Sequence, residues 1–468
     1  MVPPSSNPRR NLLQRHRGKL IFSIAGIATL FTTGSIALYL LKRWLYKQQL
    51  KITRAHFLRE QMKRRFNQTQ EDSLHTVYEL LPVVEMVLDQ NGLQLDSIIY
   101  DIKNVKKNVK GGSEVEPTNK ELKFLSKAEL WNQLTLKSII KLVTISYMTS
   151  SLFLLTRLQL NILTREYLED TIKISAENEI IPKENDTSCS VTGWISNAWS
   201  VWTGQRSSES TTVKQNDDTE LLQHDKTQVA YINEQAFLSL SWWLLNKGWF
   251  NYEQTIETII REEFSNLKPK DEITLIEFSS KLTNVFQKIN RIILSTDGSN
   301  LNLKAVLLPD ITMEQFLLQQ TLPSKSLVVL KDNKELFHKL VGETKKCLGT
   351  SASLIVFETL INECFQYIMA DVESSVIKKK KRKPTTPDAP AASAEALQNN
   401  EGEEEEKQKD MLSEDTFQVA AYAISCKDCS NVMVKKPERN EENKFLTRLD
   451  SLNVLDDLSA GVFSNLSM

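Results

Sequence analysis

The feature that most constrains this chain is an uncharged stretch near its start, residues 20–41, LIFSIAGIATLFTTGSIALYLL. At about 1.5 Å per residue, a helix of this length spans the roughly 30 Å hydrocarbon core of a bilayer. A cleaved signal peptide is the alternative, but its apolar region usually has about 7–15 residues before a small-residue cleavage site. This stretch is longer and runs directly into basic residues, so we predict a retained transmembrane helix.

Basic residues on the two sides of this stretch predict its orientation. Nine Lys or Arg lie within residues 42–65, against five within residues 9–19. Because the more basic flank of a membrane span stays on the cytoplasmic side, everything after residue 42 is expected to face the cytosol.

The two flanks themselves allow more than one interpretation. In the basic N-terminal segment, residues 1–19, the side chains at the membrane entry are either a charged flank or part of an organelle-targeting signal; they are Arg15, His16, Arg17 and Lys19. Residues 42–68 have apolar side chains at helical spacing among many basic ones, which predicts a basic membrane-proximal helix. That helix could contact lipid or be a solvated positive flank.

Composition and motif content argue against several classes of function. With 58 basic and 59 acidic residues the net charge is −1, so nothing favours binding to nucleic acid. Five scattered cysteines suit a reducing compartment. Cys426 and Cys429 lack a second pair and a nearby histidine, which argues against a zinc site. Glycine loops that cradle phosphate are absent from the sequence, which argues against a nucleotide enzyme. The five histidines are dispersed. We therefore expect no metal, no cofactor and no enzymatic activity.

The remaining chain has the periodicity of helices, so the predicted fold class is all-α, a large cytosolic bundle at residues 69–377. Ser126 and Glu129 form a capping box, which predicts a helix beginning at Lys127 and continuing to Tyr167 as the long central helix. Its apolar part, residues 142–156, is too short for a second span, which needs about 20 residues, so a buried core helix is the better interpretation.

Other local signals divide the rest of the chain. Pro82 should kink or interrupt a helix that Gly92 ends, and Gly248 should end another. A second capping box at Thr274 and Glu277 begins a further helix. We expect flexible loops at about 104–125 and 180–228, helices at 333–347 and 352–377, a disordered charged linker at 378–410, and a C-terminal helix and tail at 411–468 that docks back onto the bundle.

The first turns of the central helix suggest a binding surface. Four residues form its narrow core-facing stripe, Leu136, Ile140, Val143 and Tyr147. Trp131 and Leu134 point roughly the opposite way, on a strip shared with Lys127, Ser138 and Lys141. An apolar patch with a basic rim is typical of a partner-binding site. The alternative is that another helix covers these residues.

Several blocks of the chain resemble the fungal members of the peroxisomal biogenesis factor 3 (peroxin-3) family. They are LLQRHRGK, KRWLYKQQL, FLREQMKRRFNQTQEDSLHTVYELLP, SKAELWNQLTLKSIIKLVTISY, LTRLQLNILTR and YINEQAFLSLSWWLLNKGW. The resemblance runs nearly from end to end. Only residues 104–125, 180–228 and 378–410 lack a recognisable fixed pattern, as expected of loops.

The resemblance implies a single-pass protein of the peroxisomal membrane. The protein would pass through the endoplasmic reticulum on its way there and would contact the lipid of both membranes. Its cytosolic bundle would dock the soluble chaperone and import receptor peroxisomal biogenesis factor 19, with Trp131 as docking tryptophan, Leu134 one turn later, and Ile102 and Lys103 in the same groove. Peroxisome inheritance and selective autophagy factors are further implied partners. The alternative functions are a signal-anchored helical enzyme and an organelle-tethering adaptor of another membrane.

Overall fold

A computed structural model describes residues 17–111, 126–177, 218–295, 302–381, 415–436 and 442–464. Arg15, His16 and the side chains of Arg17 and Lys19 lie outside this description, as do most of the two predicted loops and of the charged linker. The chain divides into two compact units, one ending at Arg65 and one beginning at Phe66. All packing described below lies within the second unit unless stated otherwise.

The N-terminal helix α2, Arg17–Leu88, includes both the predicted span and the basic helix that follows it. In the first unit the described apolar side chains of α2 between residues 33 and 52 are exposed, with Ile36, Leu38 and Leu40 at 59%, 68% and 57% of their full area. Pro82 lies inside α2, so the helix is not interrupted there. The π-helical turn η1, Asp89–Leu93, follows, and Gly92 ends the stretch as predicted, with a positive φ of 92° that favours glycine.

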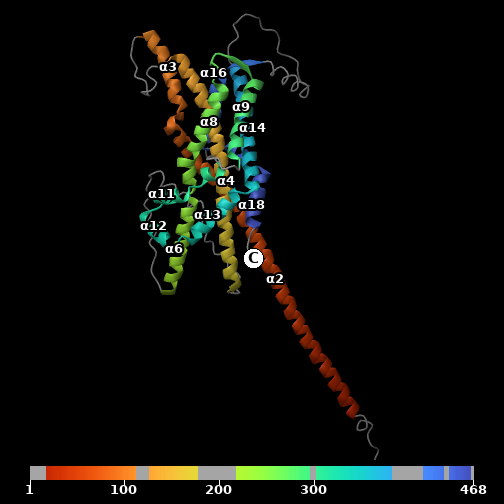
Figure 1. Cartoon of the computed structure of the whole chain (residues 1–468). Coiled ribbons are helices and arrows are strands. Elements are labelled where there is room, and N and C mark those ends of the chain that lie inside the picture. The colour runs from red at the N-terminus through yellow and green to blue at the C-terminus, as the bar shows by residue number, and fades with distance from the viewer. Residues whose placement is uncertain are drawn as a thin grey trace, which may run out of the picture. The chain divides into compact units, whose positions relative to one another are not determined.

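The rest of the described chain is almost entirely helical, which confirms the all-α class (Figure 1). Its helices are α3 (Leu95–Gly111), α4 (Lys127–Glu177), α6 (Asp218–Leu238), α7 (Ser241–Trp243), η3 (Leu244–Gly248), α8 (Trp249–Phe264), α9 (Leu275–Ile293), α10 (Leu303–Leu307), α11 (Ile311–Thr321), α12 (Ser324–Asp332), α13 (Glu335–Leu348), α14 (Ser351–Lys381), α16 (Val419–Val434), α17 (Lys444–Asp450) and α18 (Asn453–Ser464).

Some boundaries differ from those expected. Helices α3, α6 and α14 extend into segments predicted as loop or linker, to Gly111, from Asp218 and to Lys381. Lys379, in the predicted disordered linker, is instead held in place at the end of α14, because its Nζ lies 2.8 Å from Asp428 Oδ2 on α16. Two three-residue strands were not predicted. They are β1 (Glu272–Thr274) and β2 (Thr416–Gln418), which pair antiparallel with Ile273 opposite Phe417.

The central helix α4 begins where the capping box predicted. The Ser126 backbone N–H donates to Glu129 Oε2 at 2.6 Å, and the Glu129 N–H donates to Ser126 Oγ at 3.3 Å. Every residue from 138 to 162 is buried. Among the described residues α4 is the one helix long and apolar enough to cross a membrane, and its apolar window is entirely enclosed by protein. The prediction of a buried core helix is therefore confirmed.

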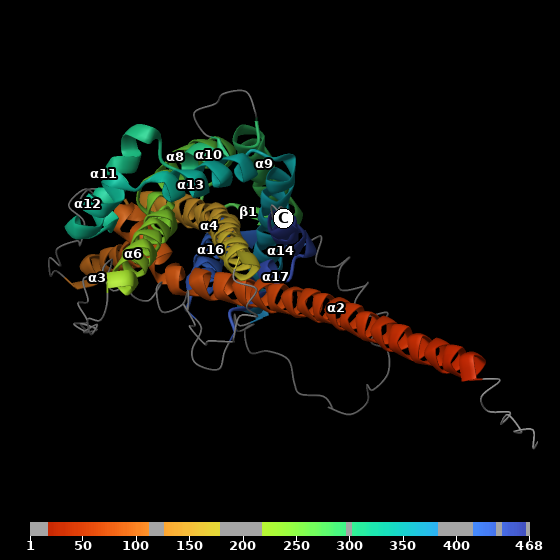
Figure 2. The same cartoon turned by 90° about the horizontal axis from the view of Figure 1, so that it is seen from below.

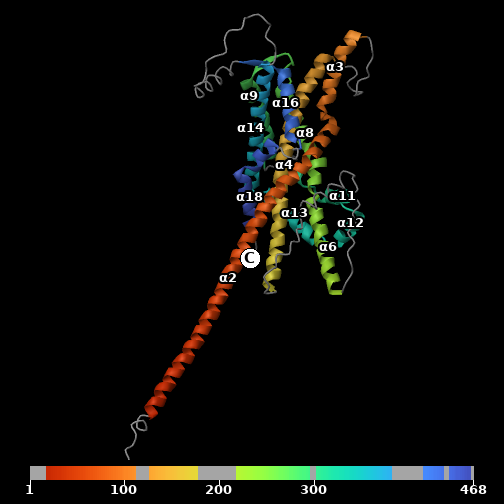
Figure 3. The ribbon, with the colours of Figure 1, turned by 180° about the vertical axis from the view of Figure 1, so that it is seen from behind.

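Helices α8, α14, α16 and α18 pack around α4, as the end-on view of Figure 2 and the rear view of Figure 3 show. Polar side chains on α4 bond to these and other neighbours. The hydroxyls of Ser151 and Tyr252 lie 2.8 Å apart, Tyr147 Oη donates to Asn290 Oδ1 at 2.6 Å, and Gln159 Nε2 donates to the Phe237 carbonyl at 2.7 Å. These bonds restrict how each neighbour can slide along α4.

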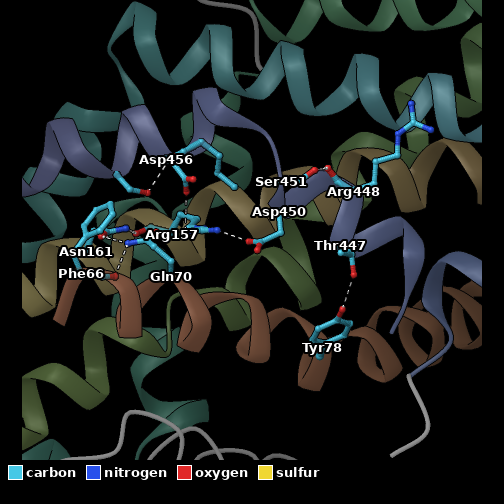
Figure 4. A network of polar contacts seen from close by, with 12 residues as sticks. Phe66, Gln70, Tyr78, Arg157, Asn161, Thr447, Arg448, Asp450, Ser451 and Asp456 are labelled. Carbon is cyan, nitrogen blue, oxygen red and sulfur yellow. Dashed lines mark hydrogen bonds and ion pairs between the residues drawn. The ribbon is translucent and has the colours of Figure 1, made fainter. Parts of the chain in front are cut away.

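A buried arginine on α4 attaches the C-terminal helices to the bundle. Arg157, with a side chain only 1% exposed, donates to Gln70 on α2 and to Asp450 on α17, and Asp456 on α18 lies 3.7 Å away (Figure 4). The hydroxyls of Tyr78 and Thr447 add a 3.4 Å contact between α2 and α17. The predicted docking of the C-terminal tail is confirmed.

Gly248 does not end a helix, contrary to prediction. Its φ of −62° is helical, and the chain continues through η3 directly into α8. A Cβ at this position would stand 2.0 Å from the Val306 carbonyl oxygen. Glycine is therefore required here because α10 approaches the backbone closely. The backbone conformation at Gly248 is helical and does not itself require glycine.

Replacing Gly248 by alanine should destabilise the protein by about 1–3 kcal/mol, because the added methyl group must displace backbone. Gly342 is the matched control, since it lies inside α13 with no atom within 4 Å of its would-be Cβ. Gly342→Ala should stabilise by about 0.5–1 kcal/mol, because alanine loses less conformational freedom on folding. Urea unfolding of both variants measures the difference, and equal effects would contradict the close approach.

Removing the charge of Arg157 should cost about 3–5 kcal/mol of unfolding free energy, because Asp450 is left partly buried and unpaired. The variants are Arg157→Met, Asp450→Leu and the double substitution, and the double variant should recover much of the loss. Arg261→Met, which removes an exposed pair with Glu257, is the control and should change stability by less than about 1 kcal/mol. Independent, additive losses at Arg157 and Asp450 would contradict the coupling.

Candidate functional site

A second apolar cluster, separate from the main core, lies where α3 runs beside the first turns of α4 (Figure 1). We call it the α3–α4 cluster; its buried members are Leu95, Ile98, Ile102, Leu130 and Leu134, with Ile99 and Trp131 half-buried against them. The spacing of three and four residues within each helix places these side chains on facing stripes. One face of α3 and the start of α4 thereby cover each other.

The structure places the predicted site residues together but not all at the surface. Trp131 and Leu134 are outside the main core, as predicted. Trp131 is half-buried and Lys103 is exposed, whereas Leu134 and Ile102 are only 1% and 6% exposed. The prediction of an exposed Leu134 was wrong, because α3 covers it. Leu134 and Ile102 belong to the buried cluster against which the Trp131 side chain packs.

The predicted basic rim is also different from expectation. Lys141 is 3% exposed and its Nζ lies 2.6 Å from Asp89 Oδ1 on η1, while Ser138 is fully buried. Lys137 Nζ donates to the Gly92 carbonyl at 2.8 Å. These lysines attach η1 to α4 and so hold the start of α3 in place. Only Lys127 of the predicted strip is an exposed cation.

Two carboxylates on either side of η1 have contrasting surroundings. Burial raises the pKa of Glu85 on α2, and the nearby Lys141 opposes the rise. Asp96 on α3 is instead largely exposed and forms a 2.6 Å ion pair with Lys427 on α16. The ion pair and the lysine contacts hold α3 to the bundle from two sides.

One buried carboxylate on α3 has no partner. Asp101 is 4% exposed, and neither of its oxygens has a hydrogen-bond partner in the part of the chain that the structure describes. The amide nitrogen of Asn104, one turn later, is also unsatisfied. Buried polar atoms are usually bonded in native proteins, so this pair is unusual.

Sequence reasoning missed Leu95, Ile98 and Leu130 as members of the site. The signal was present, because Leu95, Ile98 and Ile102 recur at helical spacing on α3. No helix was predicted over these residues, so the role of α3 as a cover for α4 was missed.

The cysteines of α16 are buried in the core of the bundle. Cys426 and Cys429 are fully buried on α16, and burial raises the pKa of the Cys426 thiol to about 12 and that of Cys429 well above its usual value. No group of three or more His, Cys, Asp or Glu that could hold a metal occurs among the described residues. An open pocket of about 460 Å³ between α14 and α18 is lined mainly by apolar side chains, including Ile355, Val356 and Leu458.

Comparison with known proteins agrees with this architecture. The sequence model of the Peroxin-3 family matches residues 11–123 and 109–465. The chain is 44% identical to peroxisomal biogenesis factor 3 of Saccharomyces cerevisiae, over 97% of this chain and 96% of the relative, and 39% identical to that of Kluyveromyces lactis, over 98% and 99%. It is 25% identical to the peroxisomal membrane protein PEX3 of Komagataella phaffii, over 97% and 98%. The chain therefore belongs to the Peroxin-3 family of peroxisome biogenesis factors.

Proposed function

We propose that this protein is a docking receptor in the peroxisomal membrane for peroxisomal biogenesis factor 19, the soluble chaperone and import receptor for membrane proteins. The observation that carries the proposal is a half-buried tryptophan, Trp131, packed on an apolar cluster of its own outside the main core. Residues that dominate the energy of protein–protein contacts are enriched in tryptophan, which supports this assignment.

The contact is a helix laid against a groove. An amphipathic helix of peroxisomal biogenesis factor 19 places its apolar side on Trp131, beside the buried cluster that includes Leu134 and Ile102. Lys103 lies exposed at the edge, where it can meet an acidic side chain of the partner. The Lys141–Asp89 pair and the Lys137–Gly92 bond keep α3 in position, so little ordering is needed on binding.

Membrane attachment is the second part of the proposal. Residues 20–41 cross the bilayer once, and the bundle faces the cytosol. The helical backbone of α2 and the exposure of Ile36, Leu38 and Leu40 support this, since such side chains are stable in lipid. The peroxisomal naming of the relatives supports the organelle, with the endoplasmic reticulum as a station in transit. Peroxisome inheritance and autophagy factors are further partners, without residues assigned to them.

An enzyme is the alternative class. It would need a concave site with convergent polar groups. The pocket between α14 and α18 has mainly apolar walls, with Asp457 and Thr350 among the few polar side chains. This favours a binding protein.

Replacing Trp131 by alanine should weaken the binding of peroxisomal biogenesis factor 19 by about thirtyfold or more, because a buried aromatic anchor is lost. The measurement is biolayer interferometry with the full chain in lipid nanodiscs. Trp242→Ala is the matched control, since Trp242 is also half-buried but packs against Phe316 on α11. Unchanged affinity in Trp131→Ala, or equal losses in both variants, would contradict the site.

The proposed topology predicts how the full chain behaves in isolated membranes. It should resist extraction at alkaline pH, and an added protease should digest the bundle while leaving an N-terminal tag protected. The sequon at Asn67 should stay unglycosylated, because it would lie in the cytosol. Substituting Leu38 and Leu40 by Asp should release the protein, because a charged side chain is costly inside a bilayer. Glycosylation at Asn67 would show that the orientation is the opposite of the one proposed.

A further inference from the structure

We infer that α2 carries a binding site for the headgroup of an anionic phospholipid, at the point where the apolar stretch 20–41 ends. The site consists of Tyr39, Lys42, Arg43 and Tyr46, which we call the headgroup face. The inference rests on the proposed topology, in which residues 20–41 cross the bilayer and the chain after them enters the cytosol.

The spacing of these residues places them together. α2 is helical through this stretch. Lys42 and Arg43 follow Tyr39 by three and four positions, and Tyr46 follows Tyr39 by seven. At about 100° per residue all four therefore lie within an arc of roughly 100° around the helix axis. At about 1.5 Å per residue they extend over roughly 10 Å, with the two cations between the two tyrosines.

The exposure of this segment suits a position at the membrane surface. Lys42 and Arg43 are exposed, and the two tyrosines of the headgroup face are each 64% exposed. The other side of the same turns is apolar, with Leu41, Trp44 and Leu45 all more than half exposed. Tyrosine and tryptophan are enriched where the hydrocarbon core meets the headgroups, so one side of these turns can contact acyl chains while the other contacts headgroups.

The donor groups of the headgroup face fit a phosphate. An arginine guanidinium donates two parallel hydrogen bonds to phosphate oxygens, and a lysine ammonium adds a compact charge. The hydroxyls of Tyr39 and Tyr46 are further donors. Because all these groups donate and none carries a negative charge, they suit a ligand that is rich in acceptors.

Charge along the sequence favours an anionic headgroup over a zwitterionic one. The first 59 residues contain eleven Lys or Arg and no Asp or Glu, so all 59 acidic residues of the chain come later, beginning with Glu60. A choline or ethanolamine headgroup has a cation of its own, for which this segment offers no carboxylate. A headgroup with net negative charge has no such mismatch, and the surrounding cations attract it.

The position of the site commits it to a lipid and not to a soluble phosphate compound. Lys42 and Arg43 directly follow the last apolar residue of the span, at the depth where the phosphates of a bilayer lie. A lipid is held there by its own acyl chains, so its headgroup pays little entropy to bind. A soluble phosphate has no such tether.

The test measures the lipid preference of the full chain reconstituted in phosphatidylcholine bilayers. The probes are spin-labelled phosphatidic acid and spin-labelled phosphatidylcholine, and electron paramagnetic resonance distinguishes lipids held at the protein from bulk lipid. The parent should prefer phosphatidic acid. Lys42→Gln with Arg43→Gln should reduce this preference by about fivefold for each charge removed, since a cation near the surface contributes about 1 kcal/mol.

Arg59→Gln with Lys63→Gln is the matched control. It removes two exposed cations from the same helix, roughly 25–30 Å beyond the headgroup face. Charges at that distance are screened at physiological salt, where the Debye length is about 8 Å, so the preference should stay within about twofold of the parent's. Equal losses in the two pairs would show a general attraction of a basic helix to the membrane and would overturn the site.

Two further measurements test the assigned groups and the assigned ligand. Tyr39→Phe with Tyr46→Phe keeps both rings and removes only the hydroxyls, so it should lower the preference by about threefold; an unchanged preference would overturn the four-residue site. Soluble glycerol phosphate in excess, at constant ionic strength, should not displace the labelled lipid. Displacement would show a site for soluble phosphate and would overturn the lipid assignment.

Alkaline extraction separates the inference from the topology on which it rests. If the parent resists extraction but has no preference for phosphatidic acid, the inference alone fails. If the parent is extracted, the proposed topology fails and the inference with it. All the variants should bind peroxisomal biogenesis factor 19 as the parent does, which checks that the bundle is folded, because the proposed docking site lies on α3 and α4.

Discussion

The complete burial of α4 is the constraint on which the rest of the structure depends. A helix with apolar side chains all around its circumference must be surrounded, and residues 138–162 are all buried by helices from both halves of the chain. Apolar burial alone would allow the neighbours many registers. The polar side chains of α4 restrict that choice, because a buried hydroxyl or amide left without its partner is costly. Ser151, Gln159 and Arg157 each bond to a different neighbouring element.

The candidate docking site follows from where this burial stops. At its N-terminal turns α4 extends beyond the main core, and its apolar residues there cluster with those of α3. A single helix covers less of a cylinder than a ring of helices does. Trp131 therefore remains half-buried while Leu134, on the covered side, is enclosed. The partly covered end of a buried helix is where a partner's helix can add to the packing.

Local signals in the sequence predicted local structure well. Ser126 and Glu129 correctly placed the start of α4, because a capping box satisfies two backbone N–H groups with residues three apart. The errors concern contacts between distant segments. Periodicity within α4 could not show that α3 covers Leu134, and nothing near Gly248 indicates the Val306 carbonyl 2.0 Å from its would-be Cβ. The pairing of Ile273 with Phe417 likewise joins segments far apart in the chain. Asp101 was missed because its burial depends on tertiary packing.

Two segments of this chain are apolar enough in sequence to be compared with a membrane span, residues 142–156 of α4 and residues 20–41, and their polar residues distinguish them. In α4 the apolar run at residues 142–156 is interspersed with Ser and Thr and followed by Arg157, Gln159 and Asn161. The partners of Arg157 come from α2 and the C-terminal helices. Those groups would be unfavourable in lipid without the same neighbours. Residues 20–41 carry no charge, and their described apolar side chains are exposed. Under the proposed topology each helix therefore has the surroundings that its polar groups require. The membrane anchor is surrounded by lipid and α4 is surrounded by protein, so both can occur in one chain.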